Sequence, residues 1–231
     1  MVQALETTDW DKLIDNLVKQ GIIRTPKIAH VMRAIPRSKF LPSDKHAYCT
    51  QDIPLNIGFG QTISAPHIVA IIDEALKLAV GLKVLEVGSG SGWHAATMAE
   101  LVTSIDAPRS EWGHICTVEI VPALAEQARK NMRNTGYGDR VTIVNADGSK
   151  GYPEKAPYDR IIVTAAAPEI PPLLLDQLKS GGIMIIPIGK ADLFQNLMRI
   201  TKEADGKIKK ENLGGVAFVP LTGEFMQKNG V

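Results

Sequence analysis

The sequence predicts an α/β fold with a doubly wound, mostly parallel sheet, N-terminal helices before it and an antiparallel C-terminal edge. Three observations lead to this prediction. Between residues 83 and 189, short apolar runs without polar alternation recur, as in strands that are covered on both faces. Helical patterns separate these runs, which is typical of parallel sheets. After residue 189, further short apolar runs follow one another across turns, which favours antiparallel strands.

Two helices are predicted at the N-terminus. In the first, one face is apolar and consists of residues at helical spacing: Trp10, Leu13, Ile14, Leu17 and Val18. The second begins at Thr25-Pro26, a capping residue followed by a proline in the first turn, and Pro36 ends it. From residue 36 to 60 the chain has no periodic pattern and is rich in Pro, Gly and Asp, and loops of this length are often functional.

Helices and strands are then predicted to alternate. Helices are expected over 64–81, 91–105, 122–136 and 171–182. Strands are expected over 83–88, 114–120, 140–147, 159–167 and 182–189. Two more strands, over 196–201 and 214–222, would form the antiparallel edge. Because no linker composition interrupts the chain, we expect one domain.

Composition limits the classes of function. The 231 residues are 45% hydrophobic and 22% charged, as in soluble globular proteins. A net charge of +1 gives no electrostatic reason to expect nucleic acid, and Lys207, Lys209 and Lys210 are expected on a solvated turn. Cys49 and Cys116 form no CxxC and have no metal-ligand spacing. Since neither a signal peptide nor an apolar run of about 20 residues is present, a cytoplasmic protein with reduced, buried thiols is predicted.

A glycine-rich turn follows the first strand of the predicted parallel sheet. In such sheets, ligands bind beyond the carboxyl ends of the strands. Here the residues are GSGSG, over 88–92, and glycines let a ligand approach the backbone closely. The third glycine falls two residues after the second, whereas the dinucleotide fingerprint has three. The spacing therefore gives less reason to expect a pyrophosphate, and a plain tight turn is the alternative.

Acidic residues end the next two predicted strands. Glu119 could accept hydrogen bonds from both ribose hydroxyls, or be an acid near the N-terminus of the helix that begins at Pro122. Asp147 could accept from an adenine amino group, or form an Asp-Gly turn with Gly148. Together with the glycine turn, the two acids predict a nucleoside ligand that does not need a phosphate.

Several segments resemble a known family. VLEVGSGSGW, VEIVPALAEQAR, DRIIVTAAAP, LKSGGIMIIPIG and FVPLTG are similar to the Rossmann-like S-adenosylmethionine-dependent methyltransferases. GFGQTISAPH, over 58–67, resembles more narrowly the protein-L-isoaspartate O-methyltransferases, and the similarity extends to about Gln227. The resemblance implies a single methyltransferase domain over 1–231. Its parts would be N-terminal helices and an active-site loop (1–60), a cofactor-binding core (61–189) and C-terminal strands (190–231).

The resemblance also implies S-adenosyl-L-methionine as cofactor, no metal, and a set of site residues. The cofactor-binding residues would be Thr62, Ile63, His67, Glu86, Gly88, Ser89, Gly90, Gly92, Glu119, Asp147, Gly148, Thr222 and Gln227. Within this set, the glycine turn would surround the methionine part with Glu86 below it. Ser64 would be the catalytic residue, donating a hydrogen bond to the substrate carboxylate. From its position alone, Ser64 is more simply explained as the cap of the helix that starts near Pro66.

The implied reaction suits the residues present. It is methyl transfer to the free α-carboxylate of L-isoaspartyl residues in damaged proteins and peptides, which starts repair through a succinimide. A carboxylate with a pKa near 4 is already ionised and needs no general base. Consistently, no Ser-His-Asp set at family spacing, HxxxH metal site or P-loop is found. The other histidines, including His94, are therefore expected to be surface or core residues.

Other functions remain open at this point. One is methyl transfer to a different carboxylate or to RNA, and another is cofactor binding without catalysis. A nicotinamide dehydrogenase is disfavoured by the glycine spacing. For partners, we expect isoaspartyl-containing peptides and proteins, no nucleic acid, no membrane, and a monomer. A substrate peptide is hypothesised to pair with the backbone of residues 215–219 by strand addition.

Overall fold

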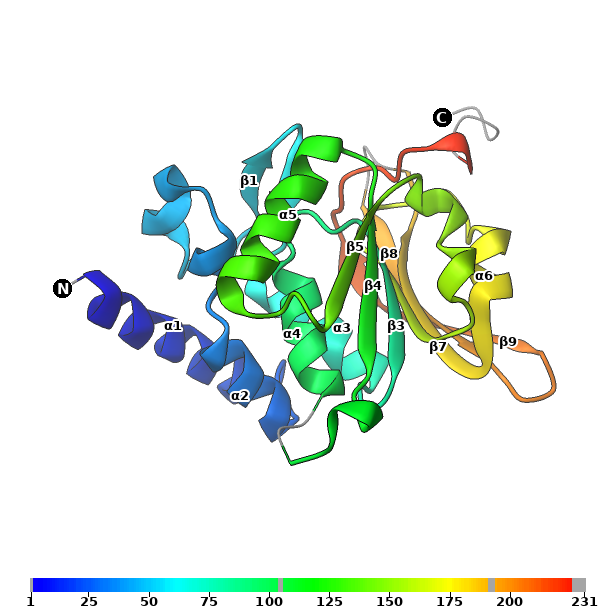
Figure 1. The fold of residues 1–231 in the computed structure, drawn as a ribbon, viewed down its shortest axis with the longest axis horizontal. Helices are drawn as coiled ribbons and strands as arrows, with labels where there is room; N and C mark the ends of the chain where they lie inside the picture. Colours follow the sequence, from blue (N-terminus) through cyan, green and yellow to red (C-terminus); the bar gives the residue numbers. More distant parts are fainter. Residues whose placement is uncertain (1, 104–105, 191–193, 226–231) are drawn as a thin grey trace.

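A seven-stranded sheet forms the centre of the molecule, in a computed structural model that describes residues 2–103, 106–190 and 194–225, with side chains from residue 9 (Figure 1). The strand order is β5-β4-β3-β6-β7-β8-β9. The strands are β3 (Lys83–Val87), β4 (His114–Glu119), β5 (Val141–Asn145), β6 (Tyr158–Val163), β7 (Leu178–Ile188), β8 (Gln195–Lys202) and β9 (Ile208–Val216). Strands β3 to β7 are parallel, whereas β8 and β9 are antiparallel. The α/β fold with an antiparallel C-terminal edge is therefore confirmed.

The order of strands reverses at β3. The chain runs outward from β3 to β4 and β5, then returns to the other side of β3 as β6. Ligands of open parallel sheets bind at such a reversal, beyond the carboxyl ends of the strands. The topology therefore places the glycine turn after β3 and the residues after β4 and β6 around one point.

Helices cover the sheet unequally on its two faces. They are α1 (Val2–Lys19), α2 (Pro26–Ala34), α3 (Pro66–Leu76), α4 (Trp93–Val102), α5 (Pro122–Thr135) and α6 (Pro172–Gln177). Neighbouring strand residues point to opposite faces, so Val84 belongs to one hydrophobic core and Leu85 to the other. The first core contains side chains from α1 to α5, whereas the second contains those of α6 and of the chain near Tyr152.

Three predicted elements differ from those observed. The helix expected to reach residue 81 ends at Leu76, because Lys77 turns into the left-handed conformation with φ 52°. The helix expected over 171–182 ends at Gln177, and β7 starts at once, bending at Gly181, whose φ is 77°. The strand expected over 214–222 is displaced, since β9 ends at Val216. The chain after it bonds instead to the loop following β6, where Ala166 N donates to Val219 O and Leu221 N to Ala166 O.

The segment from residue 36 to 60 contains structure that the sequence did not predict. After two short 3₁₀ turns, β1 (Leu55–Gly58) pairs antiparallel with β2 (Gln61–Ile63). Phe59 and Gly60 form the turn of this hairpin, with positive φ at both residues. The hairpin leads directly into α3 and so holds residues 61–64 beside the sheet.

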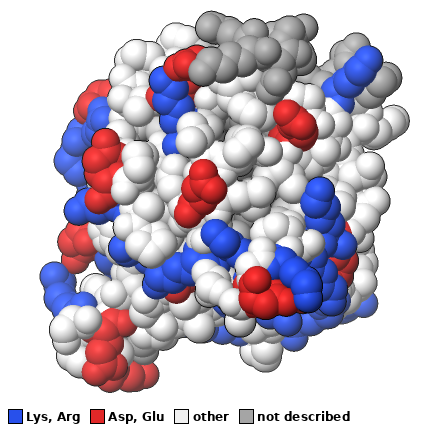
Figure 2. Space-filling model, turned by 90° about the vertical axis from the view of Figure 1, so that its right-hand side faces the viewer, with Lys and Arg blue, Asp and Glu red and all other residues white. Residues whose placement is uncertain are grey.

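Charges on the face opposite the N-terminal helices are mixed. Figure 2 shows this face, where Lys and Arg lie among Asp and Glu over the lower part and along the left edge, and the upper central surface is mostly uncharged. Lys207, Lys209 and Lys210 are all exposed, as expected, and Lys207 pairs with Asp205 at 2.8 Å. Only Lys207 lies at the turn, because Lys209 and Lys210 belong to β9. Within the described ranges, none of the helices is both long and apolar enough to cross a membrane.

Candidate active site

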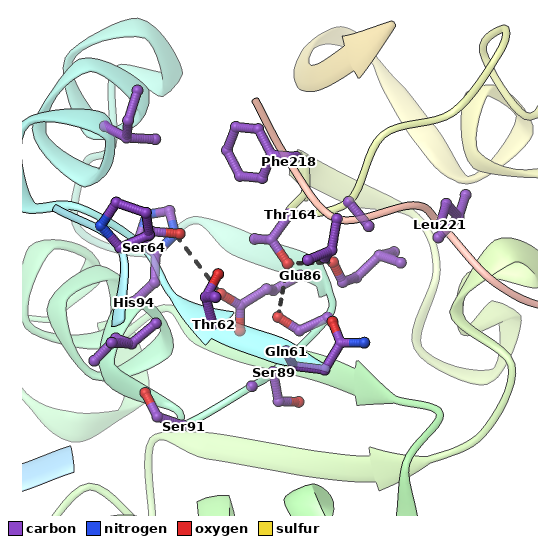
Figure 3. Close-up of a pocket in the computed structure, with 18 of the residues that line it drawn as sticks. Gln61, Thr62, Ser64, Glu86, Ser89, Ser91, His94, Thr164, Phe218 and Leu221 are labelled. Carbon is purple, nitrogen blue, oxygen red and sulfur yellow. Dashed lines mark hydrogen bonds and ion pairs between the residues drawn. The ribbon is translucent and has the colours of Figure 1, made fainter. Parts of the chain in front are cut away.

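A pocket of about 370 Å³ lies at the carboxyl ends of β3, β4 and β6. Ligand pockets are typically on the order of 300–1,000 Å³, so this one can hold a small molecule. Most of its walls come from β2 and the start of α3, the turn after β3, the ends of β4 and β6, and residues 215–222. In Figure 3, Thr62 and Ser64 lie on one side of this pocket, while Phe218 and Leu221 come from the C-terminal segment.

The glycine turn after β3 is held close to the strand that neighbours it. Gly88 has φ 98°, and a Cβ atom there would lie 2.3 Å from Oγ1 of Thr164. That hydroxyl lies 2.9 Å from both Val87 O and Gly88 O and donates to them. Only glycine permits this approach, so Gly88 fixes the start of the turn against the residue that follows β6.

Glu119 connects β4 to the glycine turn. Its carboxylate is 5% exposed, and Oε2 accepts a hydrogen bond from Gly90 N at 2.9 Å. Oε1 accepts from Val121 N at 3.0 Å, just before α5. Glu119 therefore occupies the helix N-terminus and the pocket wall at once. Its role toward a ribose stays a prediction.

Of the two roles considered for Asp147, a contact with adenine and an Asp-Gly turn, the structure shows the turn. Its Oδ1 accepts from Ser149 N and Oγ, and its Oδ2 accepts from Glu224 N at 2.8 Å. The carboxylate is thus joined to the C-terminal segment, and Gly148 rather than Asp147 lines the pocket. A role of Asp147 toward adenine stays a prediction.

Ser64 does not cap α3. The residue in the capping position is Ala65, whose side chain makes no capping hydrogen bond, and the backbone N of His67 in the first turn donates to Asp52 instead. Ser64 lines the pocket instead, and its carbonyl oxygen accepts from Nη1 of Arg37 at 3.3 Å. The interpretation of Ser64 as a cap is therefore wrong, because the helix starts one residue later than that interpretation requires.

His67 points back toward the loop that precedes the hairpin. Both its backbone N and its Nδ1 lie 2.9 Å from Oδ1 of Asp52. Burial opposes the ionisation of Asp52, but the two bonds from His67 and the charge of Arg37 outweigh it and hold the pKa of Asp52 below its usual value. Asp52 thus orients the ring of His67 at the pocket wall.

Most residues assigned from the sequence meet in this pocket. Its lining includes Thr62, Ile63, Ser64, His67, Glu86, Gly88, Ser89, Gly90, Glu119, Gly148 and Thr222. Gly92 lies behind the turn, packed against Met132, and Gln227 falls outside the described residues. Thr164 and Phe194 also line the pocket, and the sequence did not assign them to it. Phe218 lines it as well and lies within residues 215–219, which were expected to pair with a substrate peptide.

A buried ionisable cluster beneath the glycine turn was not predicted. His94, expected to be a surface or core residue, lines the pocket at 8% exposure. Its Nε2 lies 3.0 Å from Oδ1 of Asp73, and its Nδ1 lies 3.7 Å from Oε1 of Glu86. Oε2 of Glu86 accepts from Thr117 Oγ1 at 2.6 Å. No sequence signal identifies this cluster, because its members come from α3, β3, α4 and β4 without a fixed spacing.

Burial raises the pKa values of Glu86 and Asp73. It raises the pKa of Glu86 to about 7, against the lowering effect of His94 and of the bond from Thr117. It also raises the pKa of Asp73, again against His94. Burial lowers the pKa of His94, but the charge and hydrogen bond of Asp73 and the charge of Glu86 outweigh it, so the pKa is raised. Across the part of the chain described, no group of three or more His, Cys, Asp or Glu is arranged to hold a metal ion.

Comparison with known proteins gives a consistent result. The family model for protein-L-isoaspartate(D-aspartate) O-methyltransferase matches residues 8–226. The protein-L-isoaspartate O-methyltransferase of Hyperthermus butylicus is 54% identical over 214 residues, covering 93% of this chain and 88% of that one. That of Korarchaeum cryptofilum is 49% identical over 218 residues, covering 94% and 98%.

A solved structure is similar over the same length. It is a protein-L-isoaspartate O-methyltransferase from Plasmodium falciparum in complex with S-adenosyl-L-homocysteine, with 30% identity and a TM-score of 0.81. The likeness covers 92% of this chain and 98% of that one. With the family model, the two relatives and this fold in agreement, the chain belongs to the protein-L-isoaspartate O-methyltransferase family.

Proposed function

We propose that this chain methylates the free α-carboxylate of L-isoaspartyl residues in damaged proteins and peptides, with S-adenosyl-L-methionine as methyl donor. One observation carries the proposal: a single pocket joins the glycine turn and Glu119 to Ser64 and the C-terminal segment. The glycine turn and Glu119 suit a nucleoside cofactor. Ser64 and the C-terminal segment face the space in which a substrate carboxylate would be held.

The residues present fit the cofactor. Glu86 lines the pocket although it is fully buried, and within the described part of the chain its Oε1 has no hydrogen-bond partner, so the carboxylate can accept from an ammonium group. Glu119 suits a pair of ribose hydroxyls, and the backbone of Gly148 lies where a base would be held. When bound, S-adenosylmethionine supplies an electrophilic methyl group on its sulfonium.

The chain's own part in the reaction is positioning. The Ser64 hydroxyl donates to one oxygen of the substrate carboxylate and leaves the other oxygen free to act as the nucleophile. Walls from residues 61–69 and 215–222 exclude water from this space. Since the carboxylate is ionised at neutral pH, no side chain has to remove a proton. The neighbouring peptide nitrogen then attacks the ester carbonyl and expels methanol, which leaves more readily than the oxygen of a carboxylate. Water opens the resulting succinimide partly to normal aspartate.

A peptide can reach Ser64 along the C-terminal wall. Phe194 is 88% exposed and lines the pocket, and Phe218 lies on the same wall. Strand β9 is the edge of the sheet, and residues 215–219 continue from it past the pocket. An extended peptide can therefore add its backbone to this segment, with an apolar side chain against Phe194.

Methyl transfer to two synthetic peptides tests the proposal. They differ at one position, which carries either L-isoaspartate or normal L-aspartate. With labelled S-adenosylmethionine, we expect base-labile label on the isoaspartyl peptide alone. Label on neither peptide, with cofactor binding demonstrated separately, would contradict the proposal and favour another carboxylate, RNA or a binding role.

The organisation and setting of the chain are also inferred. One hydrophobic core contains Trp10, Val69 and Leu197, so residues of all three predicted parts pack together, which supports a single domain. A single cooperative unfolding transition is expected.

Both cysteines are buried thiols, which supports a reducing cytoplasm. The net charge is near zero, which supports the absence of a nucleic-acid partner. We expect a monomer by light scattering.

A further inference from the structure

Three ionisable side chains form a continuous buried path that ends in the pocket. Asp73 on α3 is 1% exposed, His94 on α4 is 8% exposed and Glu86 on β3 is 0% exposed. The imidazole of His94 lies between the two carboxylates, 3.0 Å from Asp73 and 3.7 Å from Glu86. One oxygen of each carboxylate, Oδ2 of Asp73 and Oε1 of Glu86, is buried and has no hydrogen-bond partner among the residues that the structure describes.

The charges of this path do not balance by themselves. With both acids ionised, a protonated His94 leaves one negative charge in excess, and buried charges require partners. In the free protein, a proton on Glu86 removes this excess. The other titratable groups that act on the path are also acidic: Glu119 on β4 acts on Glu86, and Glu74 on α3 acts on Asp73. When Glu86 is ionised the site therefore lacks a cation, and a ligand in the pocket that Glu86 lines can supply one.

We propose that His94, oriented by Asp73, is a positioning residue that keeps Glu86 available as a carboxylate for the α-ammonium group of the cofactor, so that cofactor binding releases a proton. This inference rests on the proposed function, because it requires that the pocket binds S-adenosylmethionine. His94 itself need not touch the cofactor, since it acts through Glu86.

The proton balance follows from the state of Glu86 in the free protein. With a pKa of about 7, roughly half of the molecules carry a protonated Glu86 at pH 7. An ammonium group can pair only with the carboxylate form, so binding to the protonated half sends the proton to solvent. No covalent bond is made or broken apart from this O–H bond.

The wild-type protein gives the first test. Titration calorimetry with S-adenosylhomocysteine at pH 7, in two buffers of different ionisation enthalpy, counts the protons released. We expect about half a proton at pH 7 and much less at pH 8. The matched ligand is 5′-methylthioadenosine, which keeps the nucleoside and the thioether but lacks the ammonium group, and it should release none. Equal proton release with both ligands, or none with either, would overturn the proposal.

Variants of the path give the second test. In His94→Gln, Glu86 loses its cationic neighbour, so its pKa rises and S-adenosylhomocysteine binds about tenfold more weakly at pH 7. The difference should close by pH 9, and 5′-methylthioadenosine should bind within about twofold of wild type at both pH values. Asp73→Asn removes the partner that raises the pKa of His94, and we expect this to outweigh the loss of the Asp73 charge that itself raises the pKa of Glu86, so S-adenosylhomocysteine should again bind more weakly at pH 7. His114→Gln is the control, because His114 bonds Thr142 on the neighbouring strand and does not line the pocket.

A purely structural role for His94 gives a different pattern. Both ligands would then lose affinity together, by the same factor at every pH, and that result would overturn the proposal. If neither variant folds, the proton count of the wild-type protein decides. Wild-type protein that does not bind S-adenosylhomocysteine would refute the proposed function, whereas pH-independent binding beside normal methyl transfer would refute this inference alone.

Discussion

Nη1 of Arg37 lies 3.3 Å from the carbonyl oxygen of Ser64, so a buried cation is attached to the wall of the pocket. Arg37 is 0% exposed, and its guanidinium also donates to four carbonyl oxygens of the preceding loop, those of Tyr48, Cys49, Gln51 and Ile53. A single side chain thus fixes the loop of residues 48–53 against the segment that carries Ser64.

Removing this guanidinium should loosen both segments. In Arg37→Met, five carbonyl oxygens lose their donor in a buried site, which costs at least about 3 kcal/mol of unfolding free energy. Urea denaturation measures this loss, and turnover should fall more than cofactor affinity because Ser64 moves. Lys39→Met, two residues away at an exposed position, should stay within about 0.5 kcal/mol of wild type. Equal stability of the two variants would show that Arg37 does not hold the loop of residues 48–53 against the segment that carries Ser64.

The hydroxyl of Ser64 is expected to matter for catalysis and not for folding. Ser64→Ala should fold normally, since this side chain does not cap α3. Losing a hydrogen bond to a charged carboxylate should lower kcat about ten- to hundredfold, with S-adenosylhomocysteine affinity unchanged. Initial rates on an isoaspartyl peptide measure this, with Ser43→Ala, an exposed serine, as control. Wild-type turnover in Ser64→Ala would remove Ser64 from the mechanism.

Gly88 should tolerate no side chain. A Cβ atom there would lie 2.3 Å from Thr164 Oγ1, in a backbone conformation that L-residues avoid. Gly88→Ala should therefore lose about 2 kcal/mol or more of stability and bind S-adenosylhomocysteine at least tenfold more weakly. Calorimetry and denaturation measure the two effects. Gly138→Ala, where a Cβ meets no atom within 4 Å, should leave both unchanged.

Glu86 should make the ligand-free protein less stable as the pH rises. Its pKa is about 7 in the folded protein, above the ordinary 4.5, so the folded state binds the proton more tightly. The stabilisation is present below pH 4.5 and is lost as the pH rises toward 7. It amounts to on the order of 3 kcal/mol. Glu86→Gln should be more stable than wild type at pH 8 and show a smaller slope between pH 5 and 7 in denaturant melts. If the unfolding free energies of wild type and Glu86→Gln change with pH in parallel, the pKa of Glu86 is not raised in the folded protein.

Phe194 should contribute to peptide binding alone. It is 88% exposed beside the pocket, and Phe194→Ala removes apolar surface that a substrate side chain can cover. The KM for an isoaspartyl peptide should rise several-fold, with cofactor affinity constant. Leu173→Ala, at an apolar residue that is 51% exposed on α6, is the control. An unchanged KM would place the peptide elsewhere.

The sequence predicted the parallel core well because its signals there are local. Apolar runs such as 83–87 and 114–119 became β3 and β4, and the glycine turn and Glu119 followed from their places at strand ends. Errors arose where distant contacts decide the conformation. Gln177 ends α6 because Leu178 pairs with Tyr158, and residues 217–221 leave β9 because they bond to Ala166. The cluster around His94 was missed for the same reason, since Asp73 and Glu86 reach it only through tertiary packing.

The two walls of the pocket come from segments separated by most of the chain, residues 61–69 and 215–222. Contacts between such distant segments form late in folding, after a large loop has closed. A cofactor that touches both walls acts as a reversible crosslink between them. At a concentration about 100 times its dissociation constant, it would add about 2.7 kcal/mol to the stability of the folded state. The supply of methyl donor would thus also set how long an unused molecule of this protein survives heat and proteolysis.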